Sequence, residues 1–69
     1  MTQESMMARF HALVNEGGEV RTAITVVGTG LCFEIDSVKR KKGAKSTEYA
    51  ECRALLKWWD EVSPSLCQN

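Results

Sequence analysis

Apolar residues near the start of the chain follow the spacing of a helix. They lie three or four positions apart, as on the buried face of an amphipathic helix, at Met6, Met7, Phe10, Leu13 and Val14. Thr2 precedes them and can cap the first turn with its hydroxyl group. The glycine pair at positions 17 and 18 is a stop signal, because glycine readily adopts the left-handed conformation after a last helical turn. The pattern predicts a helix over residues 3–15.

Between residues 19 and 38 the period of the apolar positions shortens to two, which is typical of half-buried strands. One set consists of Val20, Thr22, Ile24 and Val26, and the other of Leu31, Phe33 and Ile35. Glycines at positions 28 and 30 supply the backbone freedom that a tight hairpin turn needs. We therefore expect strands over residues 19–27 and 30–38. The register that keeps both sets on one face pairs Val26 with Leu31, and it also pairs Arg21 with Asp36.

A polar, glycine-containing connection over residues 39–45 leads to a second predicted helix over residues 47–62. Ser46 or Thr47 can cap this helix. Its apolar stripe comprises Tyr49, Cys52, Leu56 and Trp59. Pro64 ends the helix, since the residue before a proline is driven out of the helical conformation. Residues 63–69 then form a loose tail.

These elements predict a small α+β fold in a single domain, residues 1–69, with the order helix, strand, strand, helix. A lone two-stranded hairpin is marginal in water, and a chain of 69 residues buries too little surface to be stable by a wide margin. Two copies could join their hairpins into a four-stranded sheet, which would cover strand edges and enlarge the core. The sequence therefore predicts a homodimer.

Composition and charge are those of an ordinary globular protein. Hydrophobic residues make up 43% of the chain and charged residues 26%, with nine basic and nine acidic side chains, which excludes a disordered chain. No apolar run approaches the ~20 residues that a membrane helix needs. The first residues also lack the basic and apolar regions of a secretion signal. We expect a cytoplasmic protein with no membrane contact.

The basic residues are concentrated in one short segment. Five of the nine lie close together, at Lys39, Arg40, Lys41, Lys42 and Lys45. Clustered cations bind phosphate backbones through counterion release, without sequence preference. This segment is the candidate site for DNA, for RNA or for an acidic protein partner. The alternative is a solvated loop whose charge blunts a sheet edge.

Within this segment, the sequence Lys41-Lys42-Gly43-Ala44-Lys45 resembles the Lys-Lys-x-Ala-Lys motif of double-stranded-RNA-binding domains. In that family the motif contacts phosphates, so the resemblance implies phosphate contact by the lysines. The chain has room for two strands between its predicted helices and not for three. The resemblance is therefore limited to the motif, and we do not assign the chain to the family.

Trp58 lies outside the apolar stripe of the second helix. It points about 120° away from the centre of that stripe, at 100° per residue. With Leu55 and Val62 it forms a second apolar surface. Tryptophan is enriched at the centres of protein interfaces, so Leu55, Trp58 and Val62 are candidate contacts with another subunit or protein. The alternative is that the helix is sandwiched inside the fold and both tryptophans are core residues.

The reactive side chains favour binding over catalysis. His11 is the single histidine, so any histidine-dependent catalytic group must use it. The three cysteines, Cys32, Cys52 and Cys67, include no closely spaced pair of the kind that holds zinc, and their odd number favours free thiols. We expect no catalytic residues, no metal and no cofactor.

We therefore expect a non-enzymatic interaction protein that binds and modulates a larger macromolecular machine, as an inhibitor or an adaptor. Small proteins of this kind are often encoded by phages and other mobile elements. The second hypothesis is a homodimeric nucleic-acid-binding protein that contacts phosphates through the basic residues of the 39–45 segment.

Overall fold

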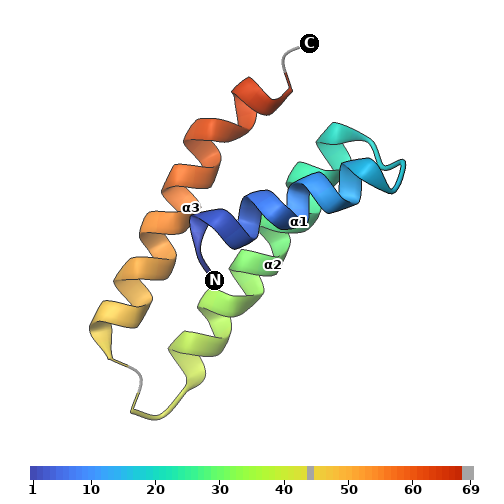
Figure 1. Cartoon of the computed structure of the whole chain (residues 1–69). Coiled ribbons are helices and arrows are strands. Elements are labelled where there is room, and N and C mark those ends of the chain that lie inside the picture. Colours follow the sequence, from blue (N-terminus) through green and yellow to red (C-terminus); the bar gives the residue numbers. More distant parts are fainter. Residues whose placement is uncertain (44, 68–69) are drawn as a thin grey trace.

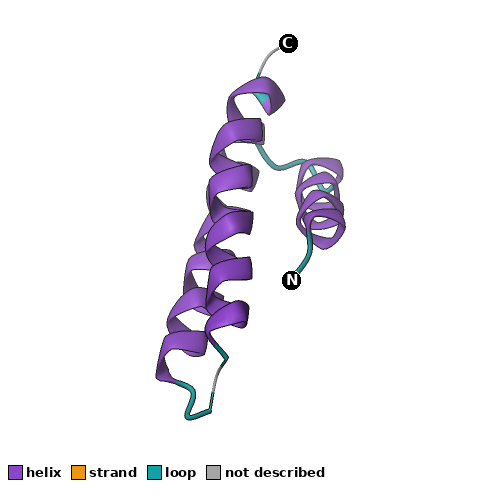
Figure 2. Ribbon diagram, turned by 90° about the vertical axis from the view of Figure 1, so that its left-hand side faces the viewer, coloured by secondary structure: helices purple, strands orange, loops and turns teal. Residues whose placement is uncertain are grey.

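The computed structural model describes residues 1–43 and 45–67, and it contains three α-helices there: α1 over Gln3–Asn15, α2 over Val20–Arg40 and α3 over Ser46–Leu66. α2 and α3 form a long antiparallel hairpin, and α1 crosses one face of it (Figure 1). A view from the side shows α1 almost end-on against that face, with the opposite face uncovered (Figure 2). The described part measures 42 × 21 × 16 Å. None of its helices combines the length and the apolar character needed to cross a membrane.

The predicted strands over residues 19–27 and 30–38 are wrong. Both segments, with the supposed turn between them, belong to the single helix α2, and no strand occurs in the described residues. The fold there is all-α and not α+β. The segment also carries a helical pattern, because the buried residues Ala23, Val27, Leu31 and Ile35 lie one turn apart. With no sheet in the described part, a homodimer cannot form by joining hairpins into four strands.

Packing explains why the helix is preferred. A helix satisfies its backbone hydrogen bonds internally, whereas a lone hairpin leaves two unpaired edges. As a helix, this segment buries one stripe against both α1 and α3. Its nine β-branched residues are each less favourable than alanine by at most about 0.7 kcal/mol, which is roughly 6 kcal/mol together. Burial against two other helices outweighs that cost.

The prediction for α1 is confirmed at both ends. The Thr2 hydroxyl accepts a hydrogen bond from the Ser5 amide at 3.1 Å, and the Ser5 hydroxyl accepts one from the Thr2 amide at 2.8 Å. The two bonds form a capping box. At the other end the Gly17 and Gly18 amides donate to carbonyls of the last turn, and Gly17 has a φ of +94°. This left-handed glycine closes the helix.

α3 differs from its prediction at both ends. It begins at Ser46 with Lys45 as its N-cap, and no side chain caps it. It also continues through Pro64 to Leu66, so residues 63–66 are helical and not a tail; residues 68–69 lie outside the described part. A proline inside a helix removes one amide donor and crowds the carbonyl four residues before it, which disfavours the helix without forbidding it. The half-buried Leu66 packs on the core, and this contact favours continuation of the helix.

The core lies where the three helices meet. Its buried residues are Met6, Phe10, Ala23, Val27, Leu31, Ile35, Cys52 and Trp59. Trp59 is the largest of them and is 2% exposed. Its burial was predicted from the stripe of α3, but it packs against helices and not against a sheet.

The Trp59 ring packs beside Gly28 of α2. A Cβ atom at Gly28 would stand 3.4 Å from two atoms of the indole ring. The indole Nε1 donates to the Ile24 carbonyl at 3.2 Å. Gly28 therefore lies within a helix, in contact with Trp59, and not in a hairpin turn.

Candidate functional site

The five clustered cations lie at one end of the α2–α3 hairpin, and we call Lys39, Arg40, Lys41, Lys42 and Lys45 the basic tip. Lys39 and Arg40 form the end of α2, so the predicted loop over residues 39–45 is shorter than expected. Lys41 and Lys42 follow in the connection, and Lys45 is the N-cap of α3. Residue 44, within the motif noted above, lies outside the described part. All five side chains are exposed.

Local structure holds the basic tip together. The Lys41 amide donates to the Ser37 and Val38 carbonyls, which ends α2, and Gly43 turns the chain with a φ of +82°. The ammonium group of Lys39 lies 5.5 Å from the centroid of the Tyr49 ring on α3. This cation–π contact joins the two helices at the tip.

Electrostatics make the basic tip available to an anion. Lys39 and Arg40 lie near the negative end of the α2 dipole, which stabilises them in place. Within residues 1–43 and 45–67 the one ion pair joins the Met1 amino group to Glu34, at 3.1 Å. None of the five tip cations is therefore paired with a carboxylate in the described part, and their field extends into solvent.

The structure places the second candidate surface against the core. Leu55, Trp58 and Val62 are each half-buried and pack on the buried cluster. The Trp58 and Trp59 ring centroids are 5.9 Å apart. Burial of Trp58 therefore needs less help from another molecule than the sequence suggested, because two helices, α1 and α2, and not a β-hairpin pack against α3. A contact of its exposed part with another protein stays a prediction.

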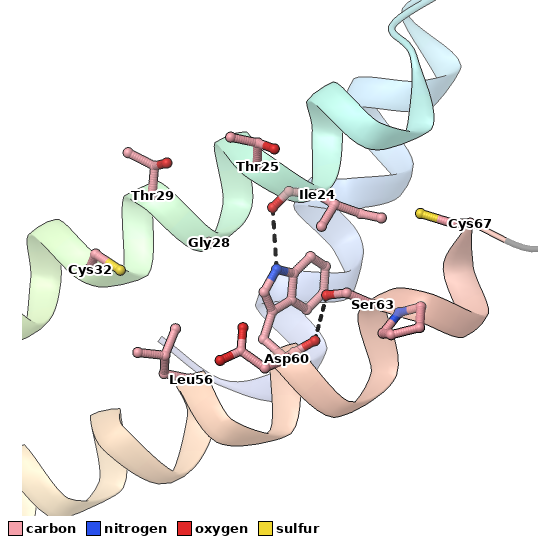
Figure 3. A pocket seen from close by; sticks show the side chains of 11 residues that line it. Ile24, Thr25, Gly28, Thr29, Cys32, Leu56, Asp60, Ser63 and Cys67 are labelled. Carbon is pink, nitrogen blue, oxygen red and sulfur yellow. Dashed lines mark hydrogen bonds between the residues drawn. The ribbon is translucent and has the colours of Figure 1, made fainter.

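A shallow groove lies on the face opposite α1 and was not predicted from the sequence. It encloses about 560 Å³ between α2 and α3, with Trp59 on its floor. Figure 3 shows Thr25, Gly28 and Cys32 along its α2 side, and Leu56 and Asp60 along its α3 side. Asp60 is its only charged lining residue. The signal in the sequence was the absence of charged residues between Arg21 and Glu34, in the segment that was predicted to form strands.

The cysteines lie apart in two environments. Cys52 is buried, and burial raises the pKa of its thiol; Glu34 raises it further. A thiol with a raised pKa stays protonated at neutral pH and reacts slowly. Cys32 and Cys67 are exposed free thiols. In the described residues no three potential ligands among His, Cys, Asp and Glu come together as a metal site would require.

Comparison with protein-family models, with curated proteins and with solved structures found no match to this chain.

Proposed function

We propose that this chain is a non-enzymatic interaction protein that binds an anionic surface of a larger macromolecule, as a small inhibitor or adaptor. The observation that carries the proposal is the basic tip: five exposed cations that no carboxylate pairs within the described residues. The tip stands at one end of a molecule 42 Å long. This position allows it to reach a partner while the rest of the chain stays clear.

The charge distribution supports binding through this end. The basic tip holds five of the nine basic residues, so four basic and nine acidic residues remain elsewhere. An anionic partner is attracted to the tip and repelled by the remainder of the chain. Electrostatic complementarity of this kind orients a partner and speeds its association.

A nucleic acid is the second candidate partner, whose phosphates the basic tip would contact. The observation that favours it is the start of α3, where the N-cap residue Lys45 makes no side-chain capping hydrogen bond. Amides of a first helical turn next to clustered lysines suit phosphate oxygens. The Lys39–Tyr49 contact adds an aromatic ring beside the cations, although that ring is already covered by Lys39.

The test is binding of labelled double-stranded DNA, double-stranded RNA and polyglutamate, measured by fluorescence anisotropy at two salt concentrations. The Lys41→Glu, Lys42→Glu double variant reverses two charges in the tip without touching the core. We expect it to lose binding to whichever polyanion the native chain binds. Binding to nucleic acid must also weaken steeply with salt, because released counterions drive it.

The matched control carries Arg53→Glu and Lys57→Glu, which reverse two exposed charges on α3 about 12 and 18 Å along the helix from Lys45, at 1.5 Å per residue. It should retain binding. Equal loss in both double variants would show a net-charge effect and contradict a local site. Absence of binding to all three probes at low salt would contradict the anion-binding tip altogether. Preference for polyglutamate would favour an acidic protein partner over nucleic acid.

A further inference from the structure

One face of α2 is exposed and uncharged along most of the helix. No acidic or basic residue occurs between Arg21 and Glu34. Within this stretch, five exposed residues share roughly a third of the helix circumference at 3.6 residues per turn: Thr22, Thr25, Thr29, Cys32 and Phe33. We call them the uncharged face. Phe33 is 67% exposed, more than any other large apolar residue in the described part.

The uncharged face lies on the side of α2 that α1 does not cover, next to the groove. Figure 3 shows Thr25 and Thr29 directed away from α3. The Thr25 hydroxyl donates to the Arg21 carbonyl of its own helix at 3.0 Å. Because this polar group is already satisfied, Thr25 presents mainly its methyl group to the outside.

The exposed positions of α3 are different. They include the charged residues Glu51, Arg53, Lys57, Asp60 and Glu61. A solvated helix face in this same molecule is therefore densely charged. The uncharged face of α2, with its exposed phenyl ring, instead has the character of a surface that another protein covers.

The two ends of the uncharged face carry opposite charges. Arg21 lies in the first turn of α2 and Asp36 lies one turn before its end, and both are exposed. Neither forms an ion pair in the described residues. Arg21 lies near the positive end of the α2 dipole and Asp36 lies near the negative end. The dipole therefore disfavours both charges. The helix itself therefore gives no reason for this arrangement.

We propose that the uncharged face joins two copies of this chain, with α2 packed antiparallel on α2 about a two-fold axis between Gly28 and Thr29. Arg21 lies as far before Gly28 as Asp36 lies after Thr29. The symmetry therefore brings each Arg21 beside Asp36 of the second copy. A two-fold interface requires such self-complementarity. This charge complementarity selects a second copy over other occupants of the face.

The proposed contact between the two copies is small. The stretch from Arg21 to Asp36 is about 22 Å long at 1.5 Å per residue. One helix pair of this length covers less than the ~800 Å² per partner of a standard interface. Neighbouring groove residues of α3, such as Leu56 and Pro64, extend it. The dimer should therefore be in reversible equilibrium with the monomer.

The dimer would also affect the proposed function. An antiparallel arrangement about Gly28–Thr29 places the two basic tips at opposite ends, about 35 Å apart along the helix axes at 1.5 Å per residue. Two linked sites bind a long polyanion more tightly than one. The dimer itself does not depend on the tip.

The test is sedimentation velocity of the native chain over a range of concentrations, under reducing conditions that keep Cys32 and Cys67 as thiols. We expect a concentration-dependent monomer–dimer equilibrium. The two-fold dimer contains two Arg21–Asp36 pairs. Arg21→Asp and Asp36→Arg each turn both pairs into pairs of like charge, and each should weaken the dimer about tenfold or more. Combining the two substitutions restores opposite charges and should restore the dimer. Circular dichroism of each variant checks that it remains helical.

Arg9→Asp is the matched control, since it makes the same chemical change at an exposed position of α1, on the opposite face of the hairpin, and should leave the dimer intact. A native chain that stays monomeric at every concentration would overturn the proposal. A dimer that both single variants leave unchanged, or that the combined variant does not recover, would place the interface elsewhere and overturn it equally. No polyanion is present, so these outcomes are independent of the test of the basic tip.

A cross-linking measurement fixes the register. In a Cys67→Ser background, Thr25→Cys introduces a thiol that the two-fold axis places beside Cys32 of the second copy. Oxidation should give a covalent dimer whose disulfide joins positions 25 and 32 in mass spectrometry. Ala50→Cys, at an exposed position of α3, is the control and should not cross-link in this way. Equal cross-linking of both variants would contradict the register.

Discussion

Trp59 connects all three helices through a single side chain. Its ring lies edge-on to Phe10 of α1, with centroids 6.2 Å apart, and its indole nitrogen donates to the Ile24 carbonyl of α2. The neighbouring Trp58 is only half-buried. Two adjacent tryptophans on one helix therefore have unequal structural roles.

Truncation of these tryptophans should show that difference. Removing a buried tryptophan costs about 3–5 kcal/mol, and a domain of this size has a free energy of unfolding near the lower end of the ~5–15 kcal/mol range. Trp59→Ala should therefore leave the chain largely unfolded, while Trp58→Ala should remain folded with a smaller loss. Urea unfolding followed by circular dichroism measures both.

Trp59→Phe serves as the control, because it keeps an aromatic ring and loses the hydrogen bond to Ile24. Its loss of stability should be smaller than that of Trp59→Ala. If Trp58→Ala unfolded the chain and Trp59→Ala were tolerated, the orientation of α3 described above would be incorrect.

At the scale of the element, α2 contains two glycines with different surroundings. Gly28 faces the Trp59 indole, whereas nothing lies within 4 Å of a Cβ atom at Gly30. Neither has a positive φ, since the positive-φ glycines in the described part are Gly17 and Gly43. Gly30 therefore serves neither a turn nor a close contact.

Gly30→Ala should stabilise the chain. Alanine is more favourable than glycine in a helix interior by about 0.8–1 kcal/mol, and the added methyl group meets open space. Chemical denaturation should show a rise of that size in the free energy of unfolding. Gly17→Ala is the contrasting variant and should destabilise, because its φ is +94°. A loss of stability in Gly30→Ala would indicate a turn at this position and contradict a continuous α2.

At the scale of the whole molecule, the charged and the uncharged candidate surfaces lie in different regions. The basic tip lies at one end, α1 covers one face of the hairpin, and the uncharged face of α2 lies on the other. The proposed binding of an anion and the proposed pairing with a second copy therefore involve separate residues. Each can be altered without the other.

This separation predicts how thermal stability depends on protein concentration. Dimerisation stabilises the folded state by mass action, so the Tm of the native chain should rise with concentration. Arg21→Asp should abolish most of that rise, and the Lys41→Glu, Lys42→Glu double variant should keep it. Differential scanning calorimetry at several protein concentrations measures this dependence of Tm for each variant. A Tm of the native chain that is independent of concentration would contradict the dimer.

Local signals in the sequence were sufficient for α1, for most of α3 and for the exposure of the basic tip. The Thr2 cap and the glycines after Asn15 act within one helical turn, so they can be recognised without knowledge of the rest of the fold. Charged lysines remain exposed in almost any fold, because burying an unpaired charge is costly. The position of the tip at the end of a hairpin, and the groove beside Trp59, were not predictable in this way.

The sequence by itself determined both ends of α1, the apolar stripe that carries Trp59, and the clustering of charge. It left the state of residues 20–40 open, because their β-branched residues alternate as in strands while Ala23, Val27, Leu31 and Ile35 also recur at helical spacing. Only the tertiary structure decided between a helix and two strands for this segment. A helix there buries its stripe against α1 and α3 at once and lets Trp59 reach the backbone beside Gly28. That burial is a long-range property, whereas alternation and turn-forming glycines are local ones.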